Sequence, residues 1–83
     1  MVTPEQCRAA RGLLDWSQQE LATRAGIGIV TVRQLEAGTI EPRRSTQTVI
    51  KQALESAGVE LIDENGGGAG VRLRDRQKPK KTP

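Results

Sequence analysis

The stretch that decides the fold is QQELATRAGIGIVTVRQLEA, residues 18–37. It reads as two short helices separated by Gly26, because apolar residues recur at helical spacing on both sides of that glycine. Two such helices can cross steeply only if the residue under the crossing is small and the turn residue accepts a positive φ, and Ala22 and Gly26 meet these needs. The residues available to fill the angle between the helices are Leu21, Ala25, Ile27, Val32 and Leu35.

Two capping signals mark where the first and second helices begin. Thr3 is followed by Pro4 and, three residues after the cap, by Gln6, which is the pattern of a capping box. Ser17 and Glu20 repeat the pattern before the second helix. The first helix is therefore expected to start after Thr3 and the second after Ser17.

The remaining helical segments follow the turn. A third helix is expected over residues 29–37, and then a loop over 39–44. A fourth helix is expected to be capped by Ser45 and to run to Ala57. The predicted fold class is mainly α, with four to five helices that form a helix-turn-helix domain over residues 1–58.

After this domain the apolar pattern changes to the alternation of β-strands, and a β-hairpin extension is predicted over residues 59–74. An isolated two-stranded ribbon is marginal in water, so its apolar residues need a partner surface. We favour pairing with the same ribbon of a second subunit, which makes the extension a dimerisation element; the alternative is a flap packed within one subunit. The residues concerned are Val59, Leu61, Val71 and Leu73.

Charge is distributed unevenly along the chain. The net charge is +3, of which residues 72–83 contribute +5 and residues 1–71 contribute −2. Residues 75–83 are charged, contain proline and lack an apolar anchor, so a disordered basic tail is predicted there. Such a tail can attract DNA in a salt-sensitive way, and it can equally serve as a solubilising or partner-binding arm.

Composition narrows the classes of function. The 83 residues include one cysteine and no histidine, which removes an internal disulfide, most zinc sites and most acid–base catalysis. No enzyme activity, metal or cofactor is therefore expected, and Cys7 is interpreted as a core residue. Trp16 is expected to cover the join between the first two helices. No apolar run approaches the roughly 18–20 residues that span a bilayer, so we expect a cytoplasmic protein without a membrane partner.

The string WSQQELATRAGIGIVTVRQLEAG, residues 16–38, resembles the helix-turn-helix of the XRE (Cro/C1, phage-repressor-like) regulators, and the similarity extends from about Thr3 through Leu61. The resemblance implies that the third helix lies in the major groove of DNA and that dimers bind palindromic operators. It also implies a structural ion pair between Arg11 and Glu36. The chain departs from the family at the cap of the third helix, where Gly28 replaces the usual Ser or Thr.

Helix geometry indicates which residues could read bases. If Val32 and Leu35 point inward, the outward face carries the base-contacting candidates Ile29, Val30, Arg33 and Gln34, joined by Thr31. Arg33 can bridge guanine O6 and N7, and Gln34 can bridge adenine N6 and N7. Two alternatives stay open: Arg33 and Gln34 are ordinary solvated residues, or one of the two apolar residues packs into the core.

Phosphate contacts are expected on both sides of this helix. Gln18 and Gln19 can offer donors at the start of the second helix, and the loop offers Thr39, Arg43 and Arg44, unless the two arginines are ordinary loop charges. The sequence thus favours a bacterial, dimeric transcriptional regulator, most simply a repressor or autoregulator, with double-stranded DNA as partner. The alternatives are an antitoxin whose C-terminal extension binds a toxin, and a protein-binding antiactivator that has lost DNA binding.

Overall fold

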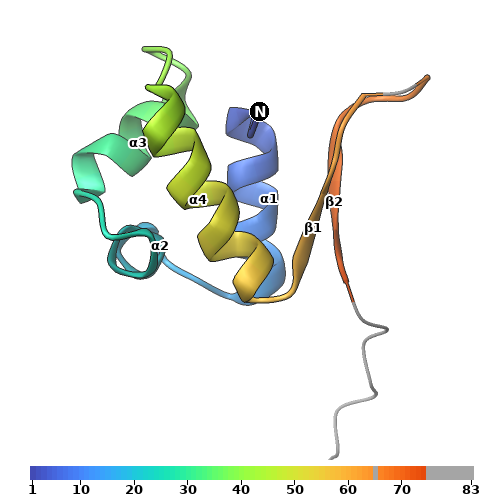
Figure 1. The fold of residues 1–83 in the computed structure, drawn as a ribbon, viewed down its shortest axis with the longest axis horizontal. Coiled ribbons are helices and arrows are strands. Elements are labelled where there is room, and N and C mark those ends of the chain that lie inside the picture. Colours follow the sequence, from blue (N-terminus) through green and yellow to red (C-terminus); the bar gives the residue numbers. More distant parts are fainter. Residues whose placement is uncertain (65, 75–83) are drawn as a thin grey trace, which may run out of the picture.

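The computed structural model describes residues 1–64 and 66–74. These residues form four helices followed by a two-stranded antiparallel sheet (Figure 1). The predicted basic tail, residues 75–83, lies outside the described residues. The elements are α1 (Pro4–Leu14), α2 (Gln18–Ala25), α3 (Ile29–Ala37), α4 (Arg44–Ser56), β1 (Val59–Ile62) and β2 (Gly70–Leu73).

The capping box of α1 forms as predicted. The Thr3 hydroxyl accepts from the Gln6 backbone N–H at 3.0 Å, and the Gln6 side-chain oxygen accepts from the Thr3 N–H at 3.0 Å. At α2 only half of the predicted box is present. The Ser17 hydroxyl accepts from the Glu20 N–H at 3.0 Å, but the Glu20 carboxylate is taken up by Arg24 at 2.8 Å. An ion pair one turn along the helix competes with the reciprocal half of the box.

The predicted cap of α4 is wrong. The N-cap is Arg43, with an extended backbone and no side-chain capping bond, so Ser45 lies inside the first turn. A serine cap is worth only about 1 kcal/mol, which a long-range contact can outweigh. That contact is made by Gln47, 8% exposed, whose side chain accepts from the Val2 N–H at 2.7 Å and donates to the Val2 carbonyl at 3.2 Å. These two hydrogen bonds hold the start of α4 against the N-terminal segment.

The core is aliphatic and lies between the four helices and the hairpin. Leu21, Val32, Ile50 and Leu54 are fully buried at its centre. Trp16 is half-buried at the join of α1 and α2, and the Arg24 guanidinium lies 4.9 Å from the centre of its ring. In the part of the chain that the structure describes, no helix is long and apolar enough to cross a membrane.

The hairpin packs within its own subunit. The register pairs Val59 with Leu73 and Leu61 with Val71, so these four side chains share one face of the ribbon. Val59 is 1% exposed, and the other three pack against the core over α1 and α4. This packing agrees with the alternative of a flap within one subunit, and pairing of the ribbon with a second subunit stays a prediction.

Gln6 ties the hairpin to α1. Its side-chain amide Nε2 donates to the carbonyl oxygens of Ile62 and Gly70 at 3.0 and 2.9 Å, while its Oε1 completes the capping box. One buried glutamine, 2% exposed, therefore both starts the first helix and holds both strands.

Candidate nucleic-acid interface

The crossing of α2 and α3 has the predicted geometry. Gly26 adopts a left-handed conformation with φ 71°, and its N–H donates to the last turn of α2. The Ile27 N–H returns to the Ala22 carbonyl at 3.0 Å, and Ala22 has no exposed surface. The turn places α3 on the side of the molecule opposite the hairpin, with α1 and α4 between them (Figure 1).

The buried carboxylate of Glu36 fixes the end of α3 to α1 and α2. Arg11 Nε lies 2.6 Å from Glu36 Oε2 and Arg11 Nη2 lies 2.8 Å from Oε1, so the pair implied by the family resemblance is bidentate. Gln18 donates to Oε1 at 3.0 Å and the Cys7 thiol to Oε2 at 3.2 Å. Arg8 donates to the Glu36 backbone carbonyl. Three residues from two helices thus hold the Glu36 side chain, and a fourth, Arg8, holds its backbone.

This network shifts three pKa values, and that of Arg11 is raised, chiefly by its hydrogen bond to Glu36. Burial alone raises the pKa of Glu36, but the hydrogen bonds from Arg11, Gln18 and Cys7 and the charge of Arg11 outweigh it, so the pKa lies below its ordinary value. Burial, followed by the hydrogen bond to the Glu36 carboxylate, raises the pKa of the Cys7 thiol far above its ordinary value. Cys7 is therefore a protonated donor that helps to hold the carboxylate.

The outward face of α3 is narrower than predicted. Val30 is 57% exposed and Arg33 is exposed, whereas Thr31 and Gln34 are half-buried. Ile29 is half-buried and packs against the core, so the expected exposed pair is reduced to Val30. The sequence analysis had left open that one residue of this pair packs into the core, and Ile29 is that residue.

A hollow joins α3 to the following loop and to α4. Thr31 and Gln34 from the base-contacting candidates line it with Arg43 from the phosphate-contacting set. Thr46, in the first turn of α4, also lines the hollow and was not among the predicted contacts; the remaining lining residues are Leu35, Ile40, Glu41 and Pro42. The neighbouring Arg43 and Arg44 were predicted from their charge, a signal that a threonine lacks.

The other predicted phosphate contacts differ in their environment. Thr39, Arg43 and Arg44 are exposed along the loop and at the start of α4. Gln19 is exposed but donates to the Thr23 hydroxyl at 3.2 Å. Gln18 is half-buried, and its amide is directed inward to Glu36 rather than to solvent. The side chain of Gln18 is therefore engaged, and its backbone N–H at the start of α2 is the donor that can bind an anion.

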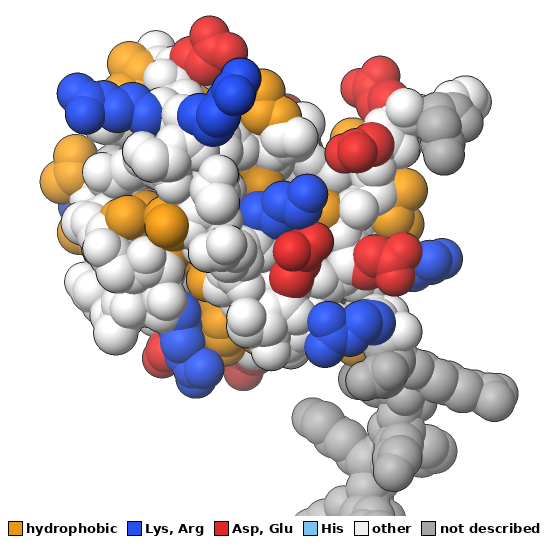
Figure 2. Space-filling model, in the orientation of Figure 1, with side chains coloured by type: hydrophobic (Ala, Val, Ile, Leu, Met, Phe, Trp, Pro, Cys, Tyr) orange, Lys and Arg blue, Asp and Glu red, His pale blue; other side chains and the backbone are white. Residues whose placement is uncertain are grey.

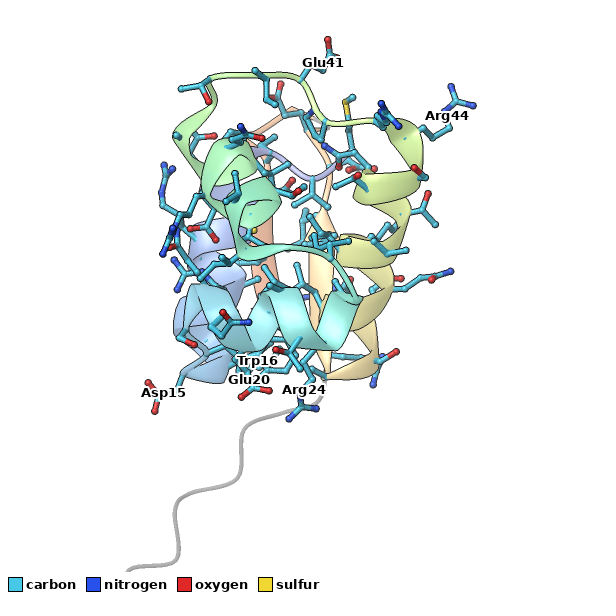
Figure 3. All side chains as sticks on the ribbon, turned by 90° about the vertical axis from the view of Figure 1, so that its left-hand side faces the viewer. Asp15, Trp16, Glu20, Arg24, Glu41 and Arg44 are labelled. Carbon is cyan, nitrogen blue, oxygen red and sulfur yellow. The ribbon has the colours of Figure 1, made fainter. Side chains whose placement is uncertain are left out.

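The arginines of the described residues divide into two groups. Five have a side-chain or backbone partner: Arg8, Arg11, Arg24, Arg72 and Arg74. Three have no ion pair or side-chain hydrogen bond within the described part of the chain, and these are Arg33, Arg43 and Arg44. All three lie on α3 or where the next helix begins, and Figure 3 shows Arg44 at the end opposite Asp15, Glu20 and Arg24.

The view in Figure 2 shows how side chains of each kind gather on one face. Lys and Arg side chains lie over the upper part of the helical body, with an acidic side chain beside them at its top edge, and hydrophobic side chains mark the edge on the side of α3. Further acidic side chains lie toward the hairpin, next to other Lys or Arg side chains. This face therefore carries charges of both signs.

The short helix α2 crosses α3, and the arginines without a partner among the described residues lie on α3 or directly after it. This arrangement is that of a DNA-binding helix-turn-helix domain. Residues 8–61 match the helix-turn-helix family, and the chain belongs to it as an XRE-like regulator. No curated protein matches the sequence. Among residues 1–64 and 66–74, no group of three His, Cys, Asp or Glu side chains is placed to hold a metal ion.

Proposed function

We propose that this chain is a sequence-specific transcriptional regulator that binds a palindromic operator as a dimer, most simply as a repressor of its own promoter. The observation that carries the proposal is the grouping of Arg33, Arg43 and Arg44. They are the arginines without a partner among the described residues, and all belong to α3 or the segment that follows it.

Each part of this surface has a distinct role in the proposal. Arg33 reads guanine in the major groove, and Val30 offers an apolar contact to a thymine methyl group. Gln34 and Thr31 face the hollow that leads to Arg43, so base reading and backbone contact meet there. Arg43 and Arg44 neutralise phosphates on one side of the groove, and the N-terminus of α2 supplies donors on the other.

The Glu36 network is the scaffold of the reading surface. It ties the last turn of α3 to α1 through the bidentate bond of Arg11 and to α2 through the hydrogen bond of Gln18. A recognition helix held in this way enters the groove in a fixed orientation, so less ordering free energy is lost on binding. In this proposal Arg11 and Glu36 position the helix and do not touch DNA.

The test is a gel-shift and footprinting experiment with the DNA upstream of the gene that encodes the chain. We expect a protected palindrome whose half-sites lie about 34 Å apart. Absence of a shift at low salt, together with tight binding to a protein, would exclude the proposal and favour an antiactivator.

Matched arginine variants sharpen this test. Arg33→Ala is expected to weaken operator binding by about 1–3 kcal/mol, with the loss confined to one base position in a mutated-operator series. Arg44→Ala should weaken binding to all sequences and reduce the salt slope by about one. Arg24→Ala removes an exposed arginine that is paired with Glu20, away from α3, and should leave the affinity unchanged. Equal losses from Arg24→Ala and Arg33→Ala would contradict the assignment of the surface to α3.

A further inference from the structure

The hairpin directs part of its backbone hydrogen-bonding groups outward, along its edges. In an antiparallel pair of strands, residues that exchange hydrogen bonds alternate with residues whose N–H and C=O groups point away from the other strand. The Arg74 N–H donates to the Gly58 carbonyl at 2.7 Å, so these two residues are a bonded pair. Counted in steps of two along the register, Val71 and Leu73 are therefore not bonded to β1, and their N–H and C=O groups point to the outer edge of β2.

The contact of Gln6 supports this pattern. One atom, Gln6 Nε2, donates to the carbonyl oxygens of both Ile62 and Gly70, which requires both oxygens to point into the ribbon. Ile62 and Gly70 are therefore also a bonded pair, as the count in steps of two demands. Among residues 1–64 and 66–74, the backbone groups of Val71 and Leu73 have no hydrogen-bond partner beyond the ribbon.

The outer edge of β2 lies on the side of α1 and has an exposed apolar side chain beside it. β2 packs against α1, whereas β1 packs against α4. Leu13 follows Gln6 by seven residues and so lies on the same stripe of α1, which faces the hairpin. Seven residues of helix and three residues of strand each span about 10 Å. Because β2 runs in the same direction as α1 (Figure 1), Leu13 lies at the level of Leu73, as Gln6 does at Gly70, and it is 43% exposed.

Arg72 determines which charge a strand added to this edge should carry. Its side chain lies on the outer face of the ribbon, between Val71 and Leu73 in sequence, is 65% exposed and lies 2.8 Å from the Glu60 carboxylate of β1. An acidic neighbour on the other side of Arg72 is stabilising, and a basic one is destabilising. A second copy of the chain does not meet this need. The antiparallel register that pairs Val71 of each copy with Leu73 of the other places the two Arg72 side chains opposite each other.

We infer that the outer edge of β2 binds an extended segment of a different protein, which adds to the hairpin as a third, antiparallel strand. The residues of this segment opposite Val71 and Leu73 are apolar and cover Leu13, and the residue opposite Arg72 is acidic. Hydrogen bonds between main chains provide affinity, and the alternate side chains provide specificity. The inference goes beyond the proposed function and does not depend on it, because the hairpin and α3 lie on opposite sides of the molecule (Figure 1).

Peptide binding to the wild-type chain tests the hydrogen bonds. The probe is a fluorescein-labelled peptide with the sequence VEVEV, followed by fluorescence anisotropy. N-methylation of its valine amides should raise the Kd at least about tenfold, because these N–H groups face β2 in the inferred register. N-methylation of its glutamate amides is the matched control and should leave the Kd nearly unchanged, since these N–H groups face solvent. Equal Kd values for the two methylated peptides, or no binding of VEVEV up to about 1 mM, overturn the inference.

Variants of the chain test the side chains at this edge. The wild type should bind VEVEV more tightly than VKVKV, and Arg72→Glu should reverse this preference. Arg24→Glu is the matched control, because Arg24 is also an exposed arginine 2.8 Å from a glutamate, and it should keep the wild-type preference. Leu13→Ser should weaken the binding of VEVEV, whereas Ile40→Ser, the same kind of change at an exposed apolar residue of a loop, should not. An Arg72→Glu variant that still prefers VEVEV overturns the inference.

Competition separates this edge from other places where an acidic peptide could bind. An excess of nonspecific duplex DNA should leave the Kd of VEVEV unchanged; displacement by DNA would place the peptide on the arginines of α3 and the segment after it, and would overturn the inference. If VEVEV dissociates a dimer of the chain in sedimentation equilibrium, a second copy occupies the edge and the inference is wrong. A chain that binds VEVEV as expected and shifts no operator DNA supports the edge and contradicts only the proposed function.

Discussion

Replacing Gln6 by glutamate separates two tasks that one side chain performs. Glutamate keeps the oxygen that accepts from the Thr3 N–H, so the capping box of α1 survives in Gln6→Glu. It removes the amide that donates to the carbonyls of Ile62 and Gly70. A carboxylate oxygen then faces two carbonyl oxygens at a site that is 2% exposed.

The expected loss of stability follows from these contacts. Each of the two lost hydrogen bonds contributes about 1 kcal/mol, and the repulsion between the buried carboxylate and the carbonyls adds about 1–2 kcal/mol, so we expect a loss of about 3–4 kcal/mol at neutral pH. A protonated glutamic acid can donate to one of the carbonyls. Burial raises the pKa of this carboxyl in the folded variant, so part of the deficit should disappear as the pH falls from neutral towards the ordinary carboxyl pKa.

Hydrogen exchange resolved by residue, together with urea unfolding, measures the effect. The amides of β1 and β2 should lose protection in Gln6→Glu more than those of α2 and α3, because the substituted contact lies between α1 and the hairpin. Gln6→Ala is the control, since it removes the cap as well and should also expose the first turn of α1. A Gln6→Glu variant whose hairpin amides keep wild-type protection would refute the assignment of the anchor to this amide.

Three further perturbations test the scaffold. Glu36→Gln should lower the free energy of unfolding by about 2–3 kcal/mol at pH 7, measured by urea unfolding. Because the pKa of Glu36 is lowered in the folded state, the carboxylate stabilises fully above the ordinary carboxyl pKa, and the difference between wild type and variant should close as the pH falls through the folded pKa. A difference that does not depend on pH would contradict this. Gly26→Ala should lower the free energy of unfolding by about 1–2 kcal/mol because the position has φ 71°, whereas Gly28→Ser, at φ −74°, should leave it unchanged or raise it by a few tenths of a kcal/mol. Equal effects of the two substitutions in thermal unfolding would exclude the argument from φ. The Cys7 thiol has no exposed surface and a raised pKa, so its reaction with a disulfide reagent should require opening of the fold and should become faster in urea. Rapid labelling under native conditions would show that α1 is not packed as described.

Local signals carried much of the fold. The cap at Thr3 and the turn at Gly26 were predictable because each depends on residues within four positions in the chain. The start of α4 was not, because a contact between Gln47 and Val2, 45 residues apart, overrides the local preference for a serine cap. A cap preference of about 1 kcal/mol is a weak guide wherever the tertiary structure offers a buried hydrogen bond.

The candidate site shows the same division. Helical periodicity correctly separated the inward residues of α3, Val32 and Leu35, from the exposed Val30 and Arg33. Periodicity could not place Ile29, because the first residue of an uncapped helix lies at the boundary where packing with the turn decides its burial. Nor could it show that the Gln18 amide is directed to Glu36, a contact that exists only after α2 and α3 have crossed.

The position of α1 gives a reason to expect that residues remote from the proposed reading surface affect it. One side of this helix carries Cys7 and Arg11, four residues apart, which meet the Glu36 carboxylate of α3. An adjacent position carries Gln6, which meets both strands of the hairpin. The helix α3 and the C-terminal hairpin are thus each hydrogen-bonded to α1, from neighbouring positions of that helix. A substitution that tilts α1 alters the angle at which α3 is presented, and DNA affinity can fall although every residue proposed to touch DNA is unchanged.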